Sequence, residues 1–143
     1  MKKYQPSFDE LDKKLDKTIQ QNFSSSYMSN QKWVKLINAF VANSEWIKKV
    51  EVKKILDERV GLLYISNDFA YQFDYWNIGF ESSHSFGGWL LYKEIEFISF
   101  PSKFQNGKLI EEQNLNRIKE IINKVGLFEL VEQDGELILF GYK

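Results

Sequence analysis

The sequence predicts an α+β fold: a mostly antiparallel sheet of about five to seven strands, two N-terminal helices, and one helix before a C-terminal hairpin. Three observations predict this class. Apolar residues recur at helical spacing in two stretches near the N-terminus and in one near the C-terminus. Short segments between them alternate apolar and polar residues, as half-buried strands do. The last apolar stretch is divided by Asp134–Gly135, a typical turn between paired strands.

The first helix is expected near the N-terminus, where Ser7 and Glu10 have the spacing of a capping box. The serine-rich stretch 24–30 then breaks the helical pattern. Residues 1–27 are therefore predicted to form an N-terminal helix and linker, and residues 28–143 a compact α+β domain. Whether the helix is an addition to that domain or part of its core stays open, although a chain of 143 residues is most simply one structural domain. The apolar face of this helix carries Phe8, Leu11, Leu15, Ile19 and Phe23.

A second helix is expected to begin at Ser29 or Asn30, which are good N-cap residues, and to end near Asn43. After it, the stretch 47–56 alternates through Val50 and Val52 and predicts a strand with one wet face. A helix over the same stretch is an alternative. Residues 61–66 (GLLYIS) predict the next strand. The apolar side of the second helix carries Trp33, Leu36, Ile37, Phe40 and Val41.

Residues 67–92 place nine aromatic rings and the only histidine in one segment. Rings alternate with small or polar residues from Phe69 to Tyr75, which predicts a strand with a ladder of rings on one face. The phase changes near residues 75–77, where a bulge or turn is expected. An exposed loop follows over residues 81–88, and residues 89–101 predict one or two strands that end at Pro101.

The last third predicts a helix and a hairpin. Leu115, Ile118, Ile121, Ile122 and Val125 form a helical stripe that Gly126 closes. Residues 127–142 then predict two paired strands joined at Asp134–Gly135.

Composition excludes several kinds of site. The chain has no cysteine, which rules out disulfides, thiol catalysis and zinc sites built on thiolates. One histidine rules out a metal site with two histidine ligands. We find no apolar run of the length that a membrane helix needs, and the charged N-terminus does not resemble a signal peptide. The sequence therefore predicts a cytoplasmic protein without cofactors and without a membrane partner.

The distribution of charge is uneven although the net charge is only −1. Residues 61–102 carry five acidic residues and a single base, Lys93. A segment of that sign repels the phosphates of nucleic acids and attracts basic surfaces. We therefore expect no nucleic-acid partner and predict that the partner is a basic protein. The chain itself is expected to be a monomer or a weak homodimer.

His84 and the acidic residues are the candidates for catalysis. The unperturbed pKa of histidine lies near neutrality, which suits a general base, but the flanking residues supply only Ser82, Ser83 and Ser85 as partners for His84. Glu94 and Glu96 are spaced to share one face of a strand, and a hard cation such as Mg²⁺ could be held there with other carboxylates. An ordinary strand with one wet face explains the same spacing and is the preferred interpretation. A metal-dependent hydrolase or nuclease using acidic residues and His84 remains an alternative function.

Tyrosine and tryptophan beside carboxylates are typical of protein interfaces, where a few buried rings carry most of the binding energy. The sequence therefore predicts a non-catalytic protein-binding module that uses an acidic aromatic surface. A self-associating structural protein is a further alternative. The predicted contact residues are Asp68, Tyr71, Asp74, Tyr75, Trp76, Glu81 and His84, with Glu94 and Glu96 contributing negative charge.

Three stretches resemble a family of small uncharacterised bacterial proteins: residues 29–40 (SNQKWVKLINAF), 92–101 (YKEIEFISFP) and 139–142 (LFGY). That family has an Asn-x-Lys-Trp opening, a Tyr-x-Glu-Ile-Glu-aromatic strand and an aromatic-Gly-Tyr close, and the resemblance covers about residues 28–143. Some members resemble immunity proteins, which neutralise a companion toxin. The resemblance thus implies an immunity protein and brings no catalytic residues with it.

Overall fold

The computed structural model describes residues 8–63, 75–76 and 90–143, and it confirms the α+β class. The helices are α1 (Phe8–Asn22), α2 (Asn30–Ala42) and α3 (Leu115–Val125), and a short 3-10 turn, η1, spans Tyr92–Glu94. The main sheet contains β1 (Val50–Lys54), β2 (Val60–Leu63), β5 (Ile95–Pro101), β8 (Glu129–Gln133) and β9 (Glu136–Phe140). Two smaller sheets contain β3 (Tyr75–Trp76) with β4 (Leu90–Leu91), and β6 (Lys103–Asn106) with β7 (Leu109–Glu112).

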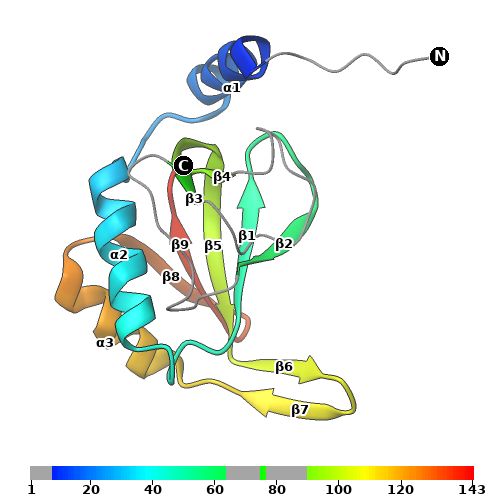
Figure 1. Cartoon of the computed structure of the whole chain (residues 1–143), viewed down its shortest axis with the longest axis vertical. Helices are drawn as coiled ribbons and strands as arrows, with labels where there is room; N and C mark the ends of the chain where they lie inside the picture. The colour runs from blue at the N-terminus through cyan, green and yellow to red at the C-terminus, as the bar shows by residue number, and fades with distance from the viewer. Residues whose placement is uncertain (1–7, 64–74, 77–89) are drawn as a thin grey trace.

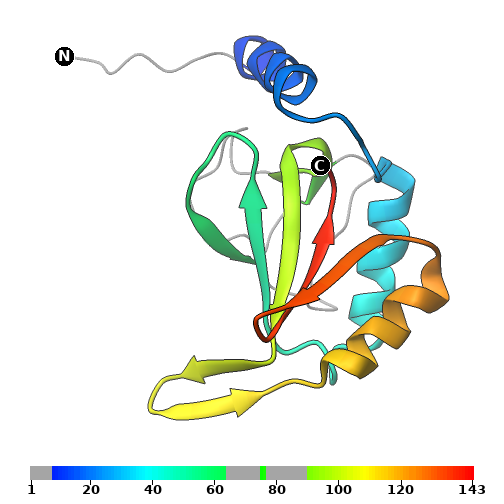
Figure 2. The same ribbon diagram turned by 180° about the vertical axis from the view of Figure 1, so that it is seen from behind.

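The main sheet is antiparallel and has the strand order β2-β1-β5-β9-β8. Helices α2 and α3 cover one face of this sheet, and α1 lies across its upper end (Figure 1). The β6–β7 hairpin extends from the opposite end of the sheet (Figures 1 and 2). The predicted strand over residues 47–56 is confirmed as β1, so the helical alternative for that stretch is wrong.

Helix α2 has both ends that the sequence predicts, and α3 ends at Gly126 as predicted, whereas the N-cap of α3 was not predicted. The Ser29 hydroxyl accepts a hydrogen bond from the Lys32 backbone N–H and caps α2, which ends at Asn43. The Asn114 side chain caps α3 in the same way, and Gly126 ends this helix. Residues close in sequence therefore define the ends of these two helices, and tertiary contacts orient their apolar faces.

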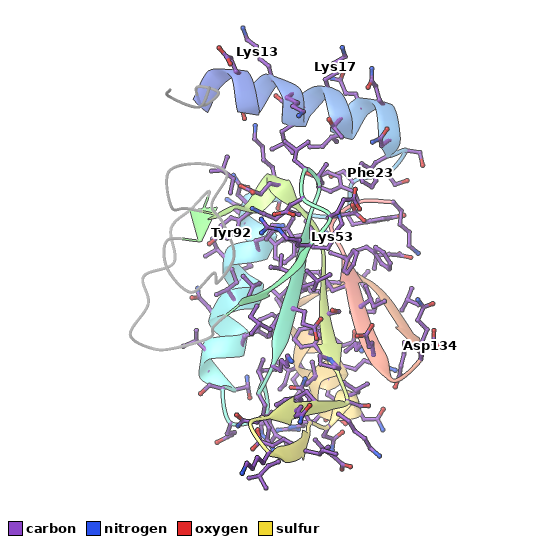
Figure 3. All side chains as sticks on the ribbon, turned by 90° about the vertical axis from the view of Figure 1, so that its right-hand side faces the viewer. Lys13, Lys17, Phe23, Lys53, Tyr92 and Asp134 are labelled. Carbon is purple, nitrogen blue, oxygen red and sulfur yellow. The ribbon has the colours of Figure 1, made fainter. Side chains whose placement is uncertain are left out.

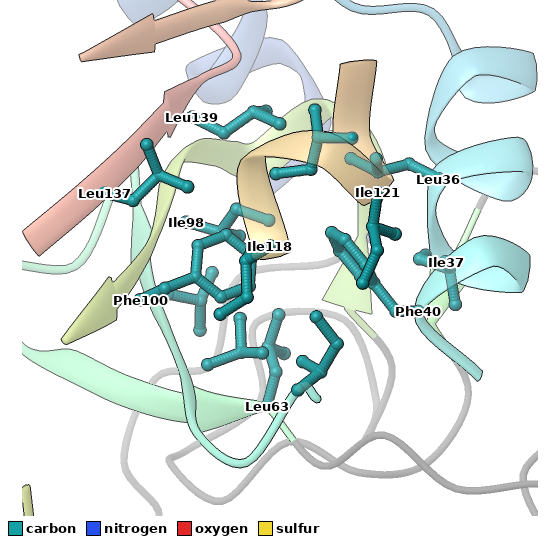
Figure 4. Packing of buried hydrophobic residues seen from close by; sticks show 14 of the residues in the cluster. Leu36, Ile37, Phe40, Leu63, Ile98, Phe100, Ile118, Ile121, Leu137 and Leu139 are labelled. Carbon is teal, nitrogen blue, oxygen red and sulfur yellow. The ribbon is translucent and has the colours of Figure 1, made fainter. Parts of the chain in front are cut away.

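The core lies between the sheet and these two helices (Figure 4). Phe40 of α2 meets Phe100 of β5 edge to face, with ring centroids 5.5 Å apart. Ile118 of α3 and Leu137 of β9 are fully buried beside them. Burial of such side chains supplies most of the stabilising free energy of a domain of this size.

A bulge in β5 shifts the pairing of β1 with β5 at the upper end of the sheet. Lys53 of β1 pairs with Phe97, whereas the next residue, Lys54, pairs with Ile95, so the register passes over Glu96. The shift turns Ile95 into the core, where it is fully buried. The Glu96 carbonyl is then available to accept hydrogen bonds from the Gly141 and Tyr142 backbone N–H groups, at 2.8 and 3.3 Å.

The C-terminal hairpin has the turn that the sequence predicts. Asp134 and Gly135 have φ angles of 51° and 77°, the left-handed values that a tight two-residue turn requires. Strands β8 and β9 pair in register on either side of the turn, from Gln133–Glu136 to Glu129–Phe140.

Helix α1 packs on the upper end of the sheet through one apolar cluster. Leu15 is fully buried against Ile55 and Leu91, and Phe23 packs beside them. Lys13 and Lys17 lie on the other side of the helix and point away from the domain (Figure 3). In the described part of the chain, no helix is both long and apolar enough to cross a membrane.

Candidate functional site

The predicted contact residues fall into three groups in the structure. Tyr75 and Trp76 form β3, and their backbones pair with Leu91 and Leu90 of β4. Glu94 and Glu96 lie in η1 and β5, where their side chains are held by lysines. The other contact residues lie outside the described part of the chain: Asp68, Tyr71, Asp74, Glu81 and His84.

Glu94 lies in the interior of the protein and is 2% exposed. One carboxylate oxygen lies 3.8 Å from the Lys54 Nζ, and the other accepts a hydrogen bond of 3.0 Å from the Leu91 backbone N–H. The carboxylate therefore closes the η1 turn and faces away from solvent. The positive charge of Lys54 partly cancels the negative charge of Glu94, so a binding partner would experience only the remainder.

Lys54 is equally buried, at 3% exposed, although it is the last residue of a strand rich in lysine. Its ammonium lies between the carboxylates of Glu94 and Asp57, the latter at 3.9 Å. Burial lowers the pKa of Lys54, and these two negative charges oppose that shift. Such a cluster is strongly destabilised when one member is removed, because the remaining charge then stays buried without its counter-ion.

Asp57 and Arg59 extend this cluster towards the surface. The Arg59 guanidinium donates two hydrogen bonds to the Asp57 carboxylate, at 3.2 and 3.0 Å, and the Arg59 backbone N–H donates a third, at 3.0 Å. These bonds lower the pKa of Asp57 to about 2. Glu96 is held separately by Lys53, at 3.4 Å, on the other face of the sheet.

Acidic side chains near η1 are thus engaged by cations from β1 and the turn that follows it. Within the described residues, no three histidine, aspartate or glutamate side chains converge in a way that could hold a metal ion. In this part of the chain, the ion pairs join the ends of β1 and β5.

The three stretches that carry the family resemblance converge at the same end of the sheet. Trp33 of α2 stacks on Tyr92 of η1, with ring centroids 6.4 Å apart, and both side chains are buried. The Tyr142 hydroxyl donates a hydrogen bond of 2.8 Å to the Lys93 carbonyl. At Gly141, an added Cβ would lie 2.6 Å from the Ile95 carbonyl oxygen, so only glycine fits. These motifs therefore have structural roles where α2, η1 and β9 meet.

The β6–β7 hairpin is the main element that the sequence analysis missed. Its tip is formed by Gly107, which has a φ of 62°, and by Lys108. The next two residues, Leu109 and Ile110, are 69% and 75% exposed, although both are large and apolar. The dipeptide Asn106–Gly107 was the available signal, because it often marks a tight hairpin turn.

The base of this hairpin is held by one buried side chain, Gln113. Its amide nitrogen donates to the Pro101 and Lys49 carbonyls, at 2.7 and 2.9 Å. Its amide oxygen accepts from the Lys48 and Lys49 backbone N–H groups, at 3.0 and 3.2 Å. These four hydrogen bonds join the end of β7 to Pro101 of β5 and to Lys48 and Lys49, which precede β1. The base of the hairpin is therefore fixed relative to the main sheet.

Residues 15–143 match the model described as a family of unknown function (DUF6678). The match starts within α1, whereas the resemblance noted in the sequence starts at about residue 28. Neither the comparison with curated proteins nor the comparison with solved structures gave a match. Because the family model covers well over half of the chain, the protein belongs to DUF6678, a family of unknown function.

Proposed function

We propose that this chain is a non-catalytic protein-binding module, and that it is an immunity protein which neutralises a toxin. The observation that carries the proposal is the projecting β6–β7 hairpin. Leu109 and Ile110 are both exposed on it, and as successive residues of β7 they present an apolar group on each face of the hairpin. Exposed apolar groups of this size on a projecting element are typical of an interface, because their burial against a partner supplies binding free energy.

The hairpin is also suited to binding by its support. Gln113 ties the end of β7 to the main sheet, and the exposed Lys103–Glu112 ion pair, with 3.7 Å between Nζ and Oε1, spans the two strands of the hairpin. A preorganised element loses little conformational entropy when it binds. Tight inhibition of a toxin requires slow dissociation, and a rigid apolar contact provides it.

The acidic aromatic segment supplies the second part of the proposal. Its sequence carries Asp68, Asp74 and Glu81 among rings and only one base within residues 61–102. Opposite charge on a basic toxin domain would accelerate the encounter, mostly at low salt. The segment would therefore contribute to the association rate, and the hairpin to the lifetime of the complex.

The test is to co-express the chain with a toxin domain encoded by a neighbouring gene, and to measure survival of the cells together with binding of the purified proteins. Ile110→Asp should weaken binding at least about tenfold and reduce protection, because it places a charge in an apolar contact. Leu127→Asp is the matched control, since Leu127 is 92% exposed but follows α3, away from the hairpin. Equal binding by wild type and Ile110→Asp would contradict the role of the hairpin.

The acidic segment is tested with charge reversals. Asp74→Lys and Glu81→Lys should slow association, and the effect should shrink as salt is added. Glu120→Lys, on the exposed side of α3, is the control. Trp76→Ala should cost about 2 kcal/mol or more of binding if its ring is an anchor. Association rates that ignore both reversals would remove this segment from the interface.

Two other functions are separated by simple measurements. A self-associating protein would elute earlier from a sizing column as its concentration rises, and Ile110→Asp would abolish that change. A metal-dependent hydrolase would be stabilised against heat by Mg²⁺, Mn²⁺ or Ca²⁺, because a ligand that binds the folded state raises its stability. We expect neither result.

A further inference from the structure

A groove lies between the inner face of the β6–β7 hairpin and the edge of the main sheet, with a cavity volume of about 240 Å³. Val50 and Leu63 line its apolar side and are themselves almost fully buried. Phe104 of β6 lines the opposite side, and Asn106 lines the end near the hairpin turn. The volume is smaller than the roughly 300–1,000 Å³ of pockets that enclose whole small-molecule ligands. It suits one inserted side chain.

The cations beside the groove are unequally engaged. Lys48 donates a hydrogen bond of 3.0 Å from its ammonium to the Glu112 carbonyl. The Lys49 ammonium lies 5.4 Å from the centre of the Phe104 ring, a cation–π contact, and it forms no ion pair within the described part of the chain. A cation above an aromatic ring and beside an apolar wall is a suitable partner for a carboxylate.

The glutamates of the hairpin differ in how far their charges are balanced. Glu112 pairs with Lys103, whereas Glu111 accepts a hydrogen bond of 3.0 Å from the neutral Asn106 side chain and keeps its negative charge. Among the charged residues that line the groove, Lys48 and Lys49 outnumber Glu111, so its rim has a net positive charge. A ligand that enters here meets positive charge around an apolar interior.

We propose that this groove binds a segment of a protein partner in which an aromatic or large aliphatic residue is flanked by acidic residues. The apolar side chain would insert between Phe104 and Leu63, and a flanking carboxylate would pair with the Lys49 ammonium. The inference rests on the proposed function, since it names the chemistry that the hairpin recognises. The partner would then meet the chain at two surfaces of opposite charge: the acidic segment within residues 61–102 and this basic groove.

The test uses three short peptides as probes: Ac-Glu-Phe-Glu-NH₂, Ac-Gln-Phe-Gln-NH₂ and Ac-Lys-Phe-Lys-NH₂. Each is titrated into the full-length, isotope-labelled chain, and the amide signals of Lys49, Phe104 and Asn106 are followed by NMR. The acidic peptide should give saturable shifts at these residues and bind about two- to fivefold more tightly than the glutamine peptide, the range expected for one partly exposed ion pair. The lysine peptide should bind more weakly than either.

Two variants locate the contact. Lys49→Gln should remove the preference for the acidic peptide, while Lys124→Gln on exposed α3 should keep it. Phe104→Ala should weaken all three peptides, because it removes one wall of the groove. Equal affinity for the acidic and neutral peptides, or shifts confined to other regions, would overturn the inference. Loss of toxin binding in Ile110→Asp with no effect of Lys49→Gln would overturn the groove and leave the proposed function standing.

Discussion

The substitution Gly141→Ala tests whether the close approach of Gly141 to the β5 backbone stabilises the fold. The added Cβ would lie 2.6 Å from the Ile95 carbonyl oxygen and 3.3 Å from that of Glu96. Ordinary van der Waals contact begins at 3.4 Å, so β9 and β5 would have to separate by about 0.8 Å at this point. Both obstacles are backbone atoms, and no rotation of a side chain relieves the contact.

The magnitude follows from what that separation breaks. The hydrogen bond from the Gly141 N–H to the Glu96 carbonyl is 2.8 Å long and would stretch to about 3.6 Å, which is too long for a hydrogen bond. Overpacking costs about 1–3 kcal/mol and the lost bond about 1 kcal/mol. The lower entropy of alanine in the unfolded chain returns about 0.4–1 kcal/mol. We therefore expect the free energy of unfolding to fall by about 1–4 kcal/mol.

Equilibrium unfolding in urea, followed by tryptophan fluorescence, measures this change. Gly126→Ala is the matched control, because its Cβ would meet only the Phe128 ring, at an ordinary 3.8 Å, and it should raise stability by no more than about 1 kcal/mol through the lower entropy of the unfolded chain. If the two variants were equally stable, the close approach at Gly141 would not constrain the fold, and the structural explanation of the aromatic-Gly-Tyr close would be refuted.

Three further predictions concern buried polar groups. Lys54→Met should cost about 3–5 kcal/mol because it leaves the Glu94 carboxylate buried without its cation, and the double variant with Glu94→Gln should recover at least half of that loss in urea unfolding. Gln113→Glu should cost about 2–4 kcal/mol at neutral pH, since a carboxylate cannot donate to the Pro101 and Lys49 carbonyls, and the loss should shrink in acid as the carboxyl group protonates. Burial, assisted by the negative charge of Asp16, raises the pKa of Tyr142 to about 12, so the neutral phenol stabilises the fold fully below about pH 10 and less as the pH rises towards 12. Tyr142→Phe should remove this alkaline loss of stability and cost about 1 kcal/mol at neutral pH through the missing bond to the Lys93 carbonyl.

Features that depend on neighbouring residues could be predicted from the sequence. The stripe of α3 and the Gly126 that closes it lie within a few residues of one another, and Asp134–Gly135 encodes its own turn. The spacing of Val50 and Val52 indicates a strand for the same reason. Each of these elements is confirmed.

Features that depend on distant residues could not. The burial of Glu94 requires Lys54 from another strand and a 3-10 turn that interrupts the predicted strand. The central place of β5 between β1 and β9 likewise requires knowledge of which strands pair. Neither fact can be deduced from the pattern of residues along the sequence.

The β6–β7 hairpin was missed for another reason. Its strands lack the regular alternation of a half-buried strand, because Leu109 and Ile110 are adjacent and both are exposed. An element that contributes nothing to the core leaves no core pattern in the sequence. For the candidate site, this means that the acidic segment was identified from composition, whereas the hairpin and its groove required the structure.

The way in which Gln113 closes the core beneath the hairpin has an evolutionary consequence. Residues 105–110 are exposed, so exchanging them removes no packed side chain and leaves the four hydrogen bonds of Gln113 in place. Most exposed substitutions change stability by no more than about 0.5 kcal/mol. Substitutions in the hairpin can therefore accumulate over evolution without destabilising the domain that carries it.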